Sequence, residues 1–190
     1  AFLLEYLDDS IKFPDEVERY TGLTLLGVIP KVSAKEGDPT EVLLKDPRSA
    51  LAESYRSLRT ALQFSTSQGA PRTLCVTSCT KNEGKSTTAY SIALTLAQLG
   101  RGVLLVDGDM RNPSLHRLFN SDHTAGLSNL LSSDVDPISV TRRTEHNNLF
   151  YISAGPLPPN PAELLSGANL AKLLNPSTSN FDHIVIDAPP

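Results

Sequence analysis

The chain has 190 residues, of which 39% are hydrophobic, and it carries a formal net charge of −4. This length and hydrophobic content suit one packed α/β domain with a small N-terminal appendage, and they exclude an intrinsically disordered chain. The negative charge and the lack of a lysine or arginine run give no support to nucleic-acid binding, so we expect no nucleic-acid partner.

The cysteines indicate the redox compartment of the protein, and the chain ends indicate whether the sequence is part of a longer one. Cys75 and Cys79 have no nearby histidine or cysteine partner, which argues against a zinc site or a disulfide framework and fits a reducing cytosol. No stretch approaches the roughly 20 apolar residues of a membrane span. The sequence starts at Ala1 without a methionine and stops at Pro190 after an expected strand. We therefore expect both ends to be cut from a longer chain.

The first third of the chain is predicted to contain mostly helices. The expected elements are helices over residues 2–12 and 15–20, a strand over 23–29, a linker over 32–40 and a helix over 49–64. The first helix is amphipathic, and the second starts with proline and acidic residues, which favour a helix N-terminus. The linker is assigned from its serine, glycine, aspartate and proline content.

Strands and helices alternate in the rest of the chain. We expect strands over residues 73–77, 103–106, 149–152 and 183–186, and helices over 85–99, 112–119, 127–131 and 160–174. The strand at 103–106 is continuously apolar, which is typical of a sheet covered on both faces. The pattern predicts a doubly wound, mainly parallel α/β sheet with flanking helices and ligands at the carboxyl ends of its strands.

The strongest chemical signal is the segment 77–87, which follows an expected strand and opens an expected helix. In a phosphate-binding loop of this kind, backbone N–H groups point at the phosphates, the lysine reaches the β- and γ-phosphates, and the hydroxyl after it binds Mg²⁺. The predicted residues of this site for ATP and Mg²⁺ are Thr80, Lys81, Asn82, Glu83, Gly84, Lys85, Ser86 and Thr87.

The loop departs from the usual pattern at two positions. Cys79 and Asn82 stand where glycines are expected. Asparagine is among the few other residues that tolerate positive φ, so we expect the loop to close.

Acidic residues follow two further strands. Asp107 and Asp109 come at the end of the second strand, where either carboxylate could hold metal-bound water or accept a proton from an attacking hydroxyl. The alternative is a strand end whose aspartate caps a helix. Asp187 follows the apolar residues 184–186, the Walker B pattern, and is expected to orient Mg²⁺ from its outer shell.

These motifs together resemble the bacterial tyrosine kinases, the cytoplasmic domains of polysaccharide co-polymerases of capsule and exopolysaccharide export. The matching pieces are residues 2–12, Gly27–Pro30, Glu53 with Arg56 and Arg59 as an ExxRxxR motif, Glu83–Ser86 as Walker A, Asp107, Asp109 and Arg111 as Walker A′, residues 155–165, and Asp187–Pro190 as Walker B. The resemblance divides the chain into a juxtamembrane-type segment and linker over 1–45 and a P-loop kinase domain over 46–190 that stops after Walker B.

The resemblance implies transfer of the γ-phosphoryl group of ATP to tyrosine hydroxyls. Lys85, Asp107 and Asp109 would be catalytic, and Ser86, Asp109 and Asp187 would hold Mg²⁺. Which of Asp107 and Asp109 is the base stays open. The usual substrate is a tyrosine-rich C-terminal tail, which is absent from this sequence.

The resemblance also implies partners and a location. Glu53, Arg56 and Arg59 would dock on a neighbouring subunit of a homo-oligomeric ring, although their spacing alone favours a solvated helix face. The membrane part of the same co-polymerase would hold the domain at the cytoplasmic face of the bacterial inner membrane.

Two other functions share the phosphate-binding loop. A ParA/MinD-type switch ATPase would need a signature lysine at the position of Thr80, and Lys81 comes one residue late. A nucleotide-sensing scaffold would bind ATP without transferring phosphate.

Overall fold

The computed structural model describes residues 13–33, 36–133, 135–176 and 180–190. The strands of this part are β1 (Thr73–Val76), β2 (Val103–Asp107), β3 (Arg142–Arg143), β4 (Leu149–Ile152) and β5 (His183–Asp187). They form one sheet in the order β1-β5-β2-β4-β3. All neighbouring pairs are parallel except β3 with β4, which are antiparallel. The mainly parallel sheet is therefore confirmed, and the antiparallel edge strand β3 was not predicted.

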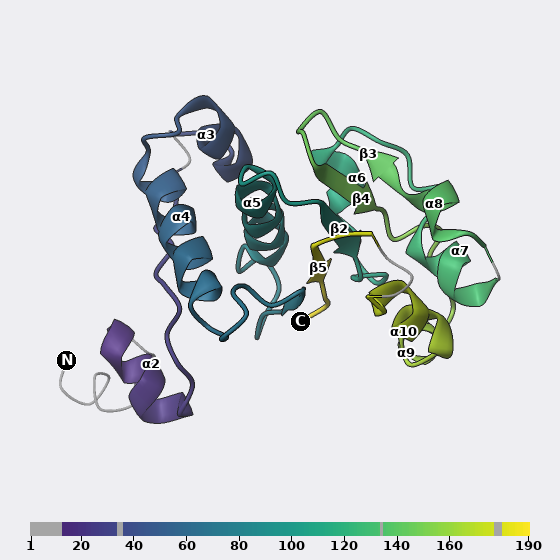
Figure 1. The fold of residues 1–190 in the computed structure, drawn as a ribbon, viewed down its shortest axis with the longest axis horizontal. Coiled ribbons are helices and arrows are strands. Elements are labelled where there is room, and N and C mark those ends of the chain that lie inside the picture. The colour runs from purple at the N-terminus through teal and green to yellow at the C-terminus, as the bar shows by residue number, and fades with distance from the viewer. Residues whose placement is uncertain (1–12, 34–35, 134, 177–179) are drawn as a thin grey trace, which may run out of the picture.

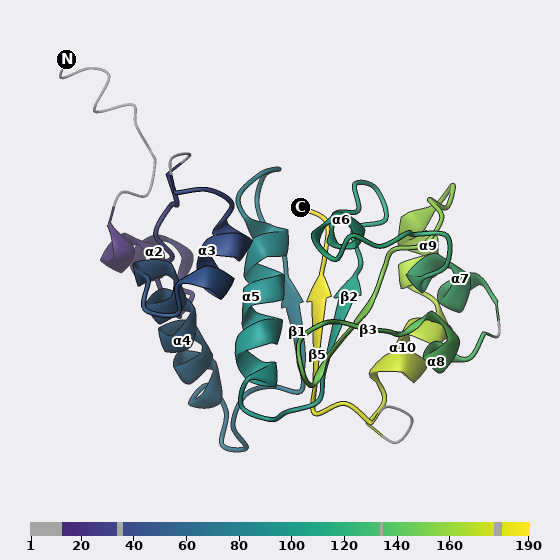
Figure 2. The same cartoon turned by 90° about the horizontal axis from the view of Figure 1, so that it is seen from above.

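Helices cover both faces of this sheet (Figure 1). The helices are α2 (Pro14–Thr21), α3 (Pro39–Lys45), α4 (Ala50–Gln63), α5 (Lys85–Ala97), α6 (Leu115–Leu118), α7 (Leu127–Ser132), α8 (Pro137–Val140), α9 (Pro161–Leu165) and α10 (Ala168–Leu174). Helix α5 packs on one face with α4 and α3 outside it, and α7 to α10 lie on the other side (Figure 2).

The two faces of the sheet bury separate hydrophobic clusters. Leu105 and Val185 point toward α5 and α4, whereas Leu104 and Ile184 belong to the cluster with α7 and α10. Every residue of β2 is buried. This arrangement explains the continuously apolar strand, because side chains that alternate between two covered faces are all removed from water.

The N-terminal part differs from its prediction. The predicted helix over residues 2–12 lies outside the described residues. The predicted strand over 23–29 is wrong, because this segment forms neither strand nor helix. It runs beside α4, where a Cβ on Gly27 would lie 3.7 Å from that of Leu58, and so it has no strand to pair with. The predicted linker ends in α3, which Asp38 caps by accepting the N–H of Thr40 at 2.8 Å.

The C-terminal part was predicted more closely, with two corrections. The single helix expected over residues 160–174 is two helices, because Gly167 adopts an extended conformation (φ −75°, ψ 161°) between α9 and α10. Asn160 precedes α9 as predicted, but its side chain donates to Glu163 at 2.9 Å and does not accept a helix N–H. In the described residues, no helix has the length and hydropathy needed to cross a bilayer.

Candidate nucleotide-binding site

The loop between β1 and α5 has the backbone expected of a phosphate-binding loop. Asn82 and Gly84 have φ values of 65° and 81°. The left-handed conformation at Asn82 confirms that asparagine replaces the usual glycine there. Gly84 is the N-cap of the 13-residue helix α5, no side chain caps this helix, and its first turn contains no acid. The first N–H groups of α5 are therefore available to an anion.

The outer side of the loop is fixed by Glu83. Its carboxylate accepts the backbone N–H of Cys79 at 3.0 Å and the hydroxyl of Thr80 at 2.8 Å. The hydroxyl of Ser78 donates to the carbonyl of Thr80 at 2.8 Å. These side-chain contacts shape the start of the loop, where a glycine is usual. The side chains of Thr80 and Glu83 therefore bind each other.

Lys85 lies between two carboxylates at the strand ends. Its Nζ donates to Asp187 Oδ1 at 2.8 Å and to Asp109 Oδ2 at 3.4 Å. Burial alone would lower the pKa of Lys85, but the hydrogen bonds and charges of Asp187 and Asp109 outweigh burial and raise it above its ordinary value. The lysine is therefore a permanent cation in the centre of the site.

Asp107 is buried behind this centre. Its Oδ2 accepts the N–H groups of Ser114 and Leu115 at 3.1 and 3.0 Å, at the start of α6. Its Oδ1 has no hydrogen-bond partner in the described part of the chain. Burial raises the pKa of Asp107 from 3.8 to about 7, despite these two N–H groups, and the charges of Asp187 and Asp109 add to the rise. Asp107 therefore holds two backbone N–H groups at the start of α6.

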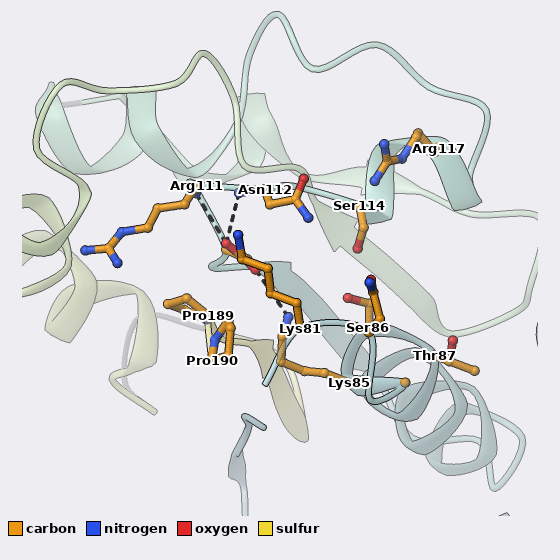
Figure 3. A pocket seen from close by; sticks show the side chains of 13 residues that line it. Lys81, Lys85, Ser86, Thr87, Arg111, Asn112, Ser114, Arg117, Pro189 and Pro190 are labelled. Carbon is orange, nitrogen blue, oxygen red and sulfur yellow. Dashed lines mark hydrogen bonds and ion pairs between the residues drawn. The ribbon is translucent and has the colours of Figure 1, made fainter. Parts of the chain in front are cut away.

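Asp109 lies in the segment that follows β2, at the cavity. Its side chain is 7% exposed, and its Oδ1 accepts the N–H groups of Arg111 and Asn112 at 3.3 and 3.0 Å. Its Oδ2 faces Lys85, as the dashed lines in Figure 3 show. Asp109 lines the cavity next to the loop, whereas Asp107 does not. The structure therefore separates the two aspartates that the sequence left equivalent.

This cavity has a volume of about 550 Å³, which suits a small-molecule ligand. Its lining consists of Lys81, Asn82, Gly84, Lys85, Ser86 and Thr87 from the loop side, Asp109, Arg111, Asn112, Ser114 and Arg117 from the opposite wall, and Pro189 and Pro190 (Figure 3). The sequence analysis missed Ser114 and Arg117, whose only signal was their closeness to the Walker A′ motif. The hydroxyl of Ser114 is buried without a hydrogen-bond partner among the described residues.

Comparisons with known proteins identify the family of this chain. A family profile described as ParA, "NUBPL iron-transfer P-loop NTPase", matches residues 70–190. The chain is 38% identical over 144 residues to the putative tyrosine-protein kinase CapB of Staphylococcus aureus, which covers 76% of this chain and 63% of CapB. The BceF tyrosine kinase domain superposes with a TM-score of 0.83 at 36% identity, over 96% of this chain and 78% of that domain.

The kinase domain of Escherichia coli tyrosine kinase ETK superposes with a TM-score of 0.86 at 26% identity, over 95% of this chain and 74% of that domain. The chain belongs to the bacterial tyrosine-kinase family. This family shares the ParA-like P-loop fold, so the predicted resemblance is confirmed. The chain spans less than two thirds of the length of CapB.

In this member of the bacterial tyrosine kinases, the ExxRxxR helix is α4. Arg56 donates to Glu53 at 2.5 Å and to the carbonyl of Pro47 at 2.6 Å. Arg59 instead donates to the carbonyl of Thr95 in α5 at 3.1 Å. Arg59 therefore ties α4 to the helix that follows the phosphate-binding loop, whereas Arg56 binds Glu53 in α4 and the residue Pro47 ahead of it.

The residues of this kinase-family site fit magnesium ATP. Two buried carboxylate oxygens, Asp107 Oδ1 and Asp187 Oδ2, have no hydrogen-bond partner in the described residues. The described part of the chain contains no group of three or more His, Cys, Asp or Glu side chains able to hold a metal alone. Mg²⁺ commonly binds one or two protein oxygens together with substrate phosphates, so Ser86 and Asp187 beside an uncapped helix suit it.

Proposed function

We propose that this domain binds ATP with Mg²⁺ and transfers the γ-phosphoryl group to tyrosine hydroxyls, within a protein that regulates capsule or exopolysaccharide polymerisation and export. One observation carries this proposal. The uncapped N-terminus of α5 and the ammonium group of Lys85 share one cavity with Asp109, next to Asp187. An anion site beside carboxylates is what a phosphoryl-transfer enzyme needs, because its catalysis consists mainly of positioning and charge stabilisation.

The residues divide into three roles in this proposal. The N–H groups of Gly84, Lys85 and Ser86 and the Lys85 ammonium group would bind phosphate oxygens. The Ser86 hydroxyl, with Asp109 and Asp187, would hold Mg²⁺, which supplies charge neutralisation at the phosphates when bound. The side chains of the other predicted loop residues Thr80 and Glu83 shape the loop, whereas Lys81, Asn82 and Thr87 line the cavity.

We assign different roles to the two aspartates. Asp109 lines the cavity, so it is the carboxylate that can accept the proton of an incoming tyrosine hydroxyl, directly or through a water molecule. Asp107 is a positioning residue, because its carboxylate holds the start of α6 and thereby the wall that carries Ser114 and Arg117. The position of Asp109 at the cavity supports this assignment, since a general base must reach the proton that it accepts.

The proposed partners follow from the family. The acceptor is a tyrosine-rich tail, and the domain acts beside the membrane part of a co-polymerase at the cytoplasmic face of the inner membrane. Neighbouring subunits would assemble into a ring through the exposed part of α4 around Glu53 and Arg56. Arg59 contributes to this surface indirectly, through its bond to α5.

Radiolabelled ATP distinguishes the proposal from its two alternatives. The protein is incubated with the labelled nucleotide, Mg²⁺ and a peptide rich in tyrosine. Phosphotyrosine that disappears in the Asp109→Asn variant supports the kinase. Release of free phosphate alone supports a switch ATPase, and binding without turnover supports a scaffold. The switch ATPase is less favoured because Thr80, at the position of its signature lysine, is bound to Glu83.

A further inference from the structure

The carboxylates of the site are turned inward and paired. Asp109 and Asp187 bind Lys85, and Asp107 binds the backbone at the start of α6. All three are buried. Their negative charge is therefore directed at the lysine and the helix, and not at the mouth of the cavity.

The mouth of the cavity carries the opposite charge. Lys81, Arg111 and Arg117 line the cavity and are exposed. Within the described residues, none of their side chains has a hydrogen bond or an ion pair. Burial, the neighbouring His123 and the charge of Arg117 lower the pKa of His116. The mouth is thus cationic in a chain whose net charge is −4.

The two arginines lie on the wall that faces the loop. Arg111 follows Asp109 and extends away from Lys85, whereas Arg117, on α6, extends over Ser114 toward the cavity (Figure 3). Lys81 belongs to the loop itself and lies across Lys85. The loop side is the anion site for the nucleotide, so the arginines of the facing wall are placed for a second anionic group.

We propose that Arg111 and Arg117 select an acceptor segment that carries acidic residues next to its tyrosine. This inference rests on the proposed kinase function and adds the chemical class of its substrate. A tyrosine that approaches Asp109 enters a cavity that Arg111 and Arg117 also line. Glutamates or aspartates beside that tyrosine would meet two guanidinium groups, which bind carboxylates through paired hydrogen bonds.

The expected effect is moderate and depends on salt. One exposed ion pair contributes only a small free energy. Two such pairs together should raise kcat/KM for an acidic acceptor by about three- to tenfold over a neutral acceptor at low ionic strength. The preference should fall toward unity at about 0.5 M salt, because exposed charges are screened over a few ångströms under these conditions.

The test uses three peptides of equal length, each with one tyrosine flanked by glutamates, glutamines or lysines. Transfer from ATP to each peptide is measured for the wild-type protein, for Arg111→Glu combined with Arg117→Glu, and for Arg101→Glu as a control. Arg101 is exposed and precedes β2, at the opposite end of the sheet from the cavity. The wild type and the control should prefer the glutamate peptide, and the double variant should prefer the lysine peptide.

The outcomes separate the inference from the function on which it rests. Equal kcat/KM for the three peptides in the wild type overturns the inference and leaves the kinase function intact. The inference is also overturned if the double variant has a raised KM for ATP and loses the same factor in kcat/KM for all three peptides. The arginines would then bind the nucleotide and not the acceptor. No transfer to any peptide despite ATP binding removes the kinase function and the inference together. Should the double variant not fold, Arg111→Gln and Arg117→Gln, which should each abolish part of the preference, replace it.

Discussion

The substitution Asp107→Asn should stabilise the protein in the absence of nucleotide. Asp107 is fully buried, and its pKa rises from 3.8 to about 7 on folding. At about 1.36 kcal/mol per pKa unit, the ionised carboxylate costs on the order of 4 kcal/mol of folding free energy. An amide removes this cost and keeps an oxygen for the N–H groups of Ser114 and Leu115.

The gain depends on pH in a defined direction. Below pH 3.8 the carboxyl group is protonated in both states, so the substitution should change little. Between pH 3.8 and about 7 the carboxyl group loses its proton in the unfolded state only. The folding free energy that Asp107 costs the wild type therefore grows with pH over this range and reaches its full value above about 7. Burying an amide N–H₂ offsets part of the gain, although Asp187 lies opposite in the sheet and has an oxygen, Oδ2, without a partner in the described residues.

We therefore expect a net gain of about 2 kcal/mol at pH 8, or roughly 5 °C in Tm for a chain of this size. Thermal unfolding is followed by circular dichroism between pH 4 and pH 8 with a chelator present. Asp136→Asn is the matched control, because this exposed cap accepts the N–H of Ile138 at 2.9 Å and makes the same change of charge. A Tm for Asp107→Asn that equals or falls below the wild-type value at pH 8 would refute the reasoning.

Four further predictions address the loop, the metal and α4. Lys85→Ala should weaken ATP binding at least tenfold in calorimetry, and unchanged affinity would refute the phosphate-binding loop. Removal of Mg²⁺ with a chelator should weaken ATP binding in the wild type, because the carboxylates of Asp109 and Asp187 then stay paired with Lys85. Equal affinities for ATP with and without the metal would contradict this prediction. Glu83→Ala should lower ATP affinity several-fold and Glu83→Gln should restore part of it, since the carboxylate shapes the loop; equal affinity of Glu83→Ala and wild type would exclude that role. Arg56→Ala should weaken self-association, as measured by sedimentation. Arg59→Ala should instead lower the free energy of unfolding by about 1 kcal/mol, because the hydrogen bond to Thr95 is lost. Identical effects of the two variants on both measurements would show that the motif acts as a unit.

The parts of the fold that the sequence predicted well are those encoded locally. Continuous apolar strands, the loop ahead of α5 and the acids after β2 and β5 lie in short segments whose spacing determines their structure. Segment 23–29 shows the limit of such reasoning. Its run of apolar residues fits a strand, but strand formation requires a neighbour, and the segment lies on Leu58 of α4.

The site shows the same division between local and long-range information. Lys85, Asp109 and Asp187 were predictable because each ends or begins an element at the same edge of the sheet. Arg117 was not, because its place at the cavity depends on α6, and α6 starts where Asp107 accepts two backbone N–H groups. A buried carboxylate ten residues before Arg117 thus helps to place this side chain at the cavity.

The pairing of Lys85 with two carboxylates has a consequence for how the site works. Lys85 is neutralised by Asp109 and Asp187, and Asp107 is half-protonated near neutral pH. Lys85 can present its full charge to phosphate only if another cation takes its place beside the two carboxylates. Mg²⁺ has the required preference for oxygen ligands. The lysine and the metal would therefore be coupled by electrostatics, which would explain why both acids stand at adjacent strand ends within reach of one ammonium group.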